Sequence, residues 1–200
     1  MSTEFGVGRG KVFPASKARS LLNPARRLVQ PASRVVDVLG VAPDARVLEL
    51  GCGPGYFSPT LATALPAGRA VLGDLQYDML QLARERTSMY DSASVVQLDA
   101  TDLPFSSGRI DAVLVVLMLG EVPDRQRCLS ECRRVLRSGG VAVFAESRRD
   151  ADCIRRSELR SLVEPHGFAL DEVRGRSFEY TARFRVVARD AHPHQYLHNK

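Results

Sequence analysis

The chain has 200 residues, of which 44% are hydrophobic and 26% are charged, and this composition is typical of a single globular domain. Its longest apolar run covers eight residues, 112–119, whereas a membrane-spanning helix needs about 20, and the amino terminus lacks the apolar core of a signal peptide. The four cysteines form no C-x-x-C pair and no zinc-type spacing with the histidines. We therefore expect a cytoplasmic protein with reduced thiols, no membrane span and no metal site.

The net charge of +5 is concentrated near the amino terminus. Residues 1–40 contain two acids, Glu4 and Asp37, and seven basic side chains: Arg9, Lys11, Lys17, Arg19, Arg26, Arg27 and Arg34. Such a segment either forms short helices with a solvated basic face or favours an anionic partner such as nucleic acid or a membrane surface. The sequence leaves both interpretations open.

Residues 1–30 are predicted to form a basic amino-terminal arm or lid. Within it, Asn23-Pro24 has the form of a helix N-cap followed by proline at the first helical position. A second helix is expected from Pro31 to Leu39, where Gly40 ends it.

From residue 46 onward, apolar segments of strand length alternate with helix-forming segments. The expected strands are 46–50, 70–73, 95–98, 111–117 and 141–145, and the expected helices begin at Ser58-Pro59 and cover 77–87, 124–137 and 157–166. This alternation predicts a parallel sheet with helices on both faces. Two further strands, 168–174 and 178–187, are joined at Gly175, and the second has one apolar face, so we expect a hairpin.

The predicted fold class is therefore α/β, with a Rossmann-like, doubly wound and mostly parallel sheet in a domain covering 31–188. The tail, 189–200, contains three histidines, His192, His194 and His198. We expect this tail to be disordered rather than to bind a metal.

A glycine-rich turn follows the first predicted strand. It reads G-x-G-x-G from Gly51 to Gly55, and a helix whose free N–H groups can bind a polar ligand comes next. A dinucleotide-binding turn needs a third glycine where this chain has Tyr56. A carboxylate two residues ahead, Glu49, would repel a pyrophosphate, but it suits the cationic methionine part of S-adenosylmethionine. The pattern therefore favours that cofactor over a dinucleotide.

Four motifs together make the chain resemble the class I S-adenosylmethionine-dependent methyltransferases over roughly residues 31–188. The motifs are Glu49-Leu-Gly51-Cys-Gly53-Pro-Gly55, Gly73-Asp74-Leu75, Asp99-Ala100-Thr101-Asp102-Leu103-Pro104-Phe105 and Leu136-Arg137-Ser138-Gly139-Gly140. The last departs from the usual family pattern by a serine in place of proline. The resemblance implies a seven-stranded sheet whose carboxy-terminal hairpin contributes one antiparallel strand.

The resemblance also implies S-adenosylmethionine as cofactor and S-adenosylhomocysteine as product. Asp74 would accept hydrogen bonds from the two ribose hydroxyls, and Asp99 one from the adenine amino group. The glycine turn would surround the methionine moiety. The implied cofactor-binding residues are Glu49, Gly51, Cys52, Gly53, Gly55, Tyr56, Asp74, Leu75, Met79, Asp99, Ala100, Val116 and Leu117.

The acceptor is expected near residues 116–124, after the fourth strand. The Asn/Asp-Pro-Pro-Tyr/Phe motif of amino-methylating nucleic-acid enzymes is missing there. The run from Leu119 to Asp124 instead resembles the small-molecule branch, which includes ubiquinone and menaquinone C-methyltransferases. Glu121 stands where those proteins often have histidine, and it is our candidate catalytic acid or base. No cap of useful length follows the fifth strand, so residues 1–22, with Phe5 and Phe13, form the candidate lid.

The first hypothesis is therefore methyl transfer by in-line displacement to a small-molecule acceptor. Two alternatives stay open: an RNA or protein methyltransferase guided by the basic arm, and a non-catalytic protein that binds S-adenosylmethionine and assists a partner. The sequence does not identify the methylated atom or the oligomeric state.

Overall fold

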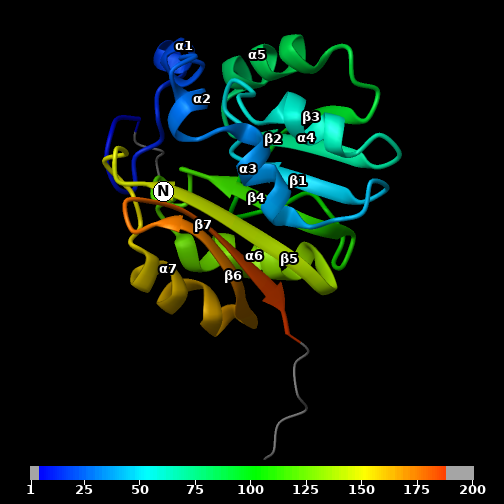
Figure 1. The fold of residues 1–200 in the computed structure, drawn as a ribbon, viewed down its shortest axis with the longest axis vertical. Helices are drawn as coiled ribbons and strands as arrows, with labels where there is room; N and C mark the ends of the chain where they lie inside the picture. Colours follow the sequence, from blue (N-terminus) through cyan, green and yellow to red (C-terminus); the bar gives the residue numbers. More distant parts are fainter. Residues whose placement is uncertain (1–4, 188–200) are drawn as a thin grey trace, which may run out of the picture.

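The computed structural model describes residues 5–187 and contains one seven-stranded sheet with the strand order β3-β2-β1-β4-β5-β7-β6 (Figure 1). The strands are β1 Arg46–Leu50, β2 Arg69–Asp74, β3 Ala93–Gln97, β4 Ile110–Val116, β5 Leu136–Ser147, β6 Phe168–Arg176 and β7 Glu179–Val186. Strands β1 to β5 are parallel, and β7 is antiparallel to both of its neighbours. The expected α/β fold with a carboxy-terminal hairpin is confirmed.

The helices are α1 Ala18–Leu21, α2 Arg26–Val29, α3 Ala32–Val36, α4 Ser58–Ala64, α5 Tyr77–Thr87, α6 Arg125–Val135 and α7 Arg156–Val163, with 3-10 turns at Ala15–Lys17, Asp37–Leu39 and Glu164–His166. Helices α3, α4 and α5 lie on one side of the sheet, and α6 and α7 lie on the other (Figure 1). Among residues 5–187, no helix has the length and apolar character needed to cross a membrane.

Alternate residues of β1 show how the sheet is buried on both faces. Val47 packs in a cluster with Val35 and Leu61 on the α3–α4 side. Leu48 and Leu50 pack in a second cluster on the α6–α7 side. A parallel strand needs apolar residues at nearly every position for this reason. Glu49 interrupts the pattern and shares the face of Val47, because successive strand residues alternate between faces.

Most predicted boundaries differ from the structure by one or two residues, and two of these differences have a clear cause. Strand β4 ends at Val116 rather than at residue 117, because Leu117 turns the backbone into the left-handed region with φ +52°. Helix α6 begins after Asp124, whose side chain accepts from the Arg127 N–H as expected of a cap, but it ends at Val135.

The residues after Val135 belong to a strand rather than to a helix end. Leu136 already pairs with Ile110 of β4, and the register then shifts before the main part of β5. Gly139, with φ +69°, lies in this irregular stretch. The pairing with β4 outweighs the helical pattern that runs on to Arg137 in the sequence. The tail, 189–200, with its three histidines, lies outside the described residues.

Candidate active site

A cavity of about 970 Å³ lies at the carboxyl ends of the parallel strands. Its walls come from the segments that follow strands β1 to β5, together with residues from the first thirty of the chain. Ligands of open α/β sheets bind at this edge, where the strand order reverses. The cavity is lined by these predicted residues: Gly51, Cys52, Gly53, Tyr56, Asp74, Leu75, Met79, Asp99, Ala100, Val116, Leu117 and Glu121.

The glycine turn after β1 has two positions where glycine is required for different reasons. Gly51 has φ +74°, and a Cβ there would collide with the side chain of Met118. Gly53 has φ +53°, and the nearest atom to a Cβ there would be Cδ1 of Leu21 at 3.8 Å. The main chain at Gly53 is therefore open to a ligand in the cavity.

Asp74 ends β2 and holds the glycine turn in place. Its Oδ2 accepts from the Gly53 N–H at 2.8 Å, and its Oδ1 accepts from the Gln76 N–H at 2.9 Å. Burial raises the pKa of this carboxyl group, while the backbone N–H donors act in the opposite direction. Each carboxylate oxygen has a further lone pair, so Asp74 can still accept two hydrogen bonds from a diol.

Asp99 follows β3, is exposed and lines the same cavity. Its Oδ1 accepts from both the N–H and the hydroxyl of Thr101, at 2.8 and 2.7 Å. These bonds shape the loop as an Asx turn. Oδ2 accepts no hydrogen bond from the described residues, so it can accept one from a ligand.

Glu49 and Gly55 do not line the cavity. Glu49 is buried, and its Oε2 accepts from the Ser58 hydroxyl at 2.7 Å, which fixes the start of α4. Burial raises its pKa to about 8. At Gly55 a Cβ would approach Cα of Ala83 to 2.9 Å, so this glycine lets α5 pack against the turn. The predicted convergence of three carboxylates is therefore reduced to Asp74 and Asp99.

Glu121 lies beyond the end of β4 and lines the cavity. Its Oε2 accepts from the backbone N–H of Phe13 at 2.9 Å. Burial raises its pKa to about 8, and the charges of Asp152, Asp150 and Asp74 act in the same direction, whereas the Phe13 N–H opposes them. Glu121 is thus a partly buried carboxyl group that can hold a proton near neutral pH.

Residues 9–15 form what we call the N-terminal strap, which crosses the carboxyl edge of the sheet. Arg9 pairs with Glu158 through two hydrogen bonds of 2.7 and 2.9 Å, and the Gly10 N–H donates to the Gly120 carbonyl at 2.9 Å. Further along, the Gln76 side chain donates to the Phe13 carbonyl and accepts from the Ala15 N–H. The strap therefore connects the loops after β4 and β2 across the cavity. Sequence reasoning anticipates a lid here but none of these contacts.

Arg26 of α2 is a lining residue that sequence reasoning places only within the basic arm. Its guanidinium carbon lies 4.6 Å from the ring centre of Tyr56 and 5.0 Å from that of Phe57. It donates twice to Oε1 of Gln30, at 3.2 and 2.9 Å, and once to the Leu21 carbonyl at 3.3 Å. No local motif signals this arrangement, because the rings lie about thirty positions further along the chain.

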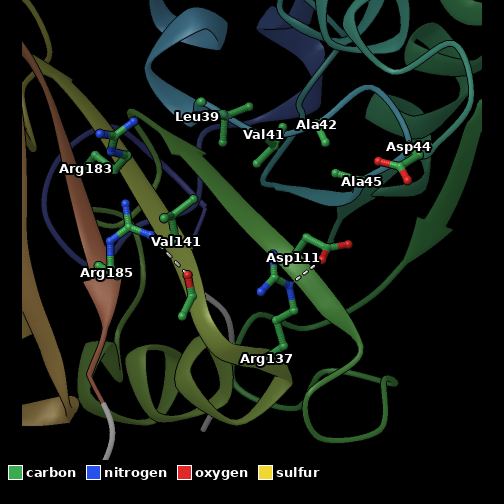
Figure 2. Close-up of a pocket in the computed structure, with 12 residues that line it drawn as sticks. Leu39, Val41, Ala42, Asp44, Ala45, Asp111, Arg137, Val141, Arg183 and Arg185 are labelled. Carbon is green, nitrogen blue, oxygen red and sulfur yellow. Dashed lines mark hydrogen bonds and ion pairs between the residues drawn. The ribbon is translucent and has the colours of Figure 1, made fainter.

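A second cavity, of about 440 Å³, lies at the opposite edge of the sheet (Figure 2). Three arginines line it, and each already pairs with a carboxylate. Arg137 pairs with Asp111, while Arg183 and Arg185 both pair with Asp171. Asp111 also accepts from the Arg46 N–H at 2.8 Å. The first pair joins the starts of β5 and β4, and the pairs with Asp171 join β7 to β6. We assign this cavity no ligand.

The lining of the larger cavity suits S-adenosylmethionine. Asp74 offers the acceptors that a ribose diol needs, and Gly53 leaves its main chain open. Apolar side chains, among them Met79, Leu98 and Val116, supply the contact surface that a nucleoside requires. Carboxylates in the lining also suit a cationic sulfonium.

Comparisons with known proteins agree with this description. Residues 48–144 match the family model described as a methyltransferase domain. Over 115 residues, 57% of the chain, it is 39% identical to an uncharacterised 37.1 kDa protein in a transposon of Streptomyces fradiae, covering 33% of that protein. Over the same length it is 33% identical to demethylmenaquinone methyltransferase of Staphylococcus aureus, covering 48% of it. The chain thus spans a third to about half of these curated relatives.

The fold itself matches a solved structure over nearly its whole length. A S-adenosylmethionine-dependent methyltransferase from Aquifex aeolicus superposes with a TM-score of 0.81 at 18% identity, over 88% of this chain and all of the other. That likeness shows the fold, and the family match adds the sequence signature around the glycine turn. The chain therefore has the fold of a S-adenosylmethionine-dependent methyltransferase, and residues 48–144 carry the sequence signature of a methyltransferase domain.

Proposed function

We propose that this chain transfers the methyl group of S-adenosylmethionine to a small-molecule acceptor that binds beside Glu121. One observation carries the proposal: a single cavity contains the glycine turn, Asp74 and Glu121, and the N-terminal strap crosses it. A cavity bounded in this way suits an acceptor small enough to be enclosed with the cofactor. The similarity to demethylmenaquinone methyltransferase supports an acceptor of metabolite size.

Features of the amino-terminal segment argue against RNA as the acceptor. Arg9 is engaged with Glu158, and Arg26 is stacked on aromatic rings inside the cavity wall. These two basic side chains are therefore not presented to an external phosphate backbone. Leu117 to Gly120 also lacks the two prolines that the amino-methylating nucleic-acid enzymes have at this point.

The main task of the protein in this reaction is to place the acceptor in line with the methyl group. Bound S-adenosylmethionine supplies a methyl group already activated on a sulfonium sulfur. The chain's own residues hold the acceptor in line, and placement of this kind contributes about 7–11 kcal/mol. Glu121 can take the proton that an O–H or N–H acceptor loses, because its Oε1 accepts no hydrogen bond from the described residues. The strap limits the access of water.

The direct test uses S-adenosylmethionine with a radioactive methyl group. The purified chain is incubated separately with a small-molecule extract, with total RNA and with total protein. The proposal predicts label in the small-molecule fraction, and none with the Asp74→Ala variant. Label in RNA or protein would overturn it, and so would binding of the cofactor with no transfer to any fraction, which is the outcome expected of a non-catalytic partner.

A further inference from the structure

Arg26 lines the larger cavity and has no carboxylate partner, in contrast to the three arginines that line the smaller cavity. Arg137, Arg183 and Arg185 each form an ion pair within 3.0 Å. For Arg26, no ion pair with a carboxylate exists among residues 5–187, and its acceptors are neutral oxygens of Gln30 and Leu21. A cation of this kind in a cavity wall is a candidate ligand-binding group.

The surroundings of Arg26 fix its position and disfavour its charge. Stacking on Tyr56 and Phe57 and two bonds to Gln30 hold the guanidinium in one orientation. Burial lowers its pKa, and the carboxylates that oppose this effect act only from a distance. An anion bound in the cavity would offset the cost of burying this charge.

The guanidinium also has donors to spare. Of its five N–H groups, three are used: Nε and one on Nη2 by Gln30, and one on Nη1 by the Leu21 carbonyl. One N–H therefore remains on each Nη. A carboxylate accepts two hydrogen bonds in a bidentate pair with arginine.

The position of Arg26 along the cavity indicates which carboxylate it binds. It packs on Tyr56 and Phe57, which directly follow the glycine turn. Around Glu121, by contrast, the charges of Asp152, Asp150 and Asp74 would repel an anionic acceptor. Building on the proposed function, we propose that Arg26 binds the carboxylate of the methionyl group of S-adenosylmethionine.

The test is a calorimetric comparison of two ligands. S-adenosylhomocysteine has the methionyl-type carboxylate, whereas 5′-methylthioadenosine has the same adenosyl group and sulfur without it. In Arg26→Gln the Kd of S-adenosylhomocysteine should rise about 10- to 100-fold, the range expected of a charge-assisted pair. The Kd of 5′-methylthioadenosine should stay within about twofold. Arg27→Gln is the matched control, since it removes an exposed positive charge from the same helix and should change neither value.

Two results would overturn the inference. The first is an equal loss of affinity for both ligands, which would indicate that Arg26 only supports the aromatic rings, and the second is no loss of affinity for either ligand. If Arg26→Gln does not fold, Arg26→Lys takes its place in the experiment. The lysine variant should bind S-adenosylhomocysteine more weakly and 5′-methylthioadenosine as tightly as wild type, because lysine keeps the positive charge but lacks the paired N–H donors of arginine. Wild-type protein that binds neither ligand contradicts both this inference and the proposed function. If Arg26→Gln loses affinity for S-adenosylhomocysteine alone, but the wild-type protein transfers no methyl group to any acceptor, only the proposed function is contradicted.

Discussion

The carboxylate of Glu121 accepts a hydrogen bond of 2.9 Å from the backbone N–H of Phe13, 108 positions away in the sequence. This bond joins the N-terminal strap to the loop after β4, beside which we propose that the acceptor binds. Glu121 therefore has two separable functions in this account: one oxygen holds the strap, and the other faces the acceptor. Substitutions that differ only in hydrogen-bonding capacity can distinguish them.

Replacing Glu121 tests the contact with the strap. Glu121→Gln keeps a side-chain oxygen that can accept from the Phe13 N–H, whereas Glu121→Ala removes it. We expect hydrogen exchange in a peptide covering residues 9–15 to quicken several-fold in the alanine variant and to stay near the wild-type rate in the glutamine variant. Equal exchange rates in all three proteins would show that this bond does not hold the strap.

The pH dependence of methyl transfer tests the proton-accepting function of Glu121. Its pKa is raised to about 8, so the carboxyl group is mostly protonated at pH 7 and becomes a base as the pH rises through about 8. Turnover should increase over this interval and then level off. Glu121→Gln should lower turnover about 100-fold and remove this step in the profile. An unchanged profile in the variant would assign the proton transfer to another group.

Gly51 and Gly53 form a matched pair, because both have positive φ angles but only Gly51 is crowded. Gly51→Ala should lower the free energy of unfolding by about 3 kcal/mol, from backbone strain together with the clash against Met118. Gly53→Ala should cost about 1–2 kcal/mol and should weaken S-adenosylhomocysteine binding at least about tenfold, since its Cβ would enter the space a ligand needs. Denaturant unfolding and calorimetry measure the two effects. Equal stability of the two variants would contradict this reading of the turn.

Much of the fold was accessible from local patterns. The apolar segments predicted all seven strands, with every boundary except the start of β5 within two residues, because buried strands leave a strong apolar signal. The start of β5 was missed, because the pairing of Leu136 with Ile110 is a tertiary contact that overrides the helical pattern.

The candidate site was only partly accessible from the sequence. Motif spacing correctly predicted that Asp74 and Asp99 line the cavity, since Asp74 ends β2 and Asp99 follows β3 at the same edge of the sheet. The glycine-turn motif also predicted a ligand contact for Glu49. In the structure, Glu49 instead lies on the face of β1 that packs against α4, where it accepts a hydrogen bond from Ser58. Arg26 carried no signal of its own, because its partners depend on how the amino-terminal segment folds back on the domain.

Glu49 makes stability depend on pH. Its pKa in the folded protein is about 8, above the ordinary 4.5. Its contribution to the free energy of unfolding is therefore complete below pH 4.5 and is lost as the pH rises through about 8. Each pKa unit corresponds to about 1.4 kcal/mol. Glu49→Gln retains an acceptor for Ser58 without a charge to bury, so it should be more resistant to urea than wild type at pH 9 and similar to it at pH 5. A wild-type advantage at pH 9 would show that Glu49 is ionised and stabilised in the folded state.

The most direct measurement of the central claim is a calorimetric titration of the full chain with S-adenosylhomocysteine. The account predicts saturable binding of one ligand per chain, weakened about 10- to 100-fold in Asp74→Asn, which keeps one of the two carboxylate oxygens as an acceptor but loses the negative charge. Folded wild-type protein that shows no binding, or an Asp74→Asn variant that binds as tightly as wild type, would contradict it.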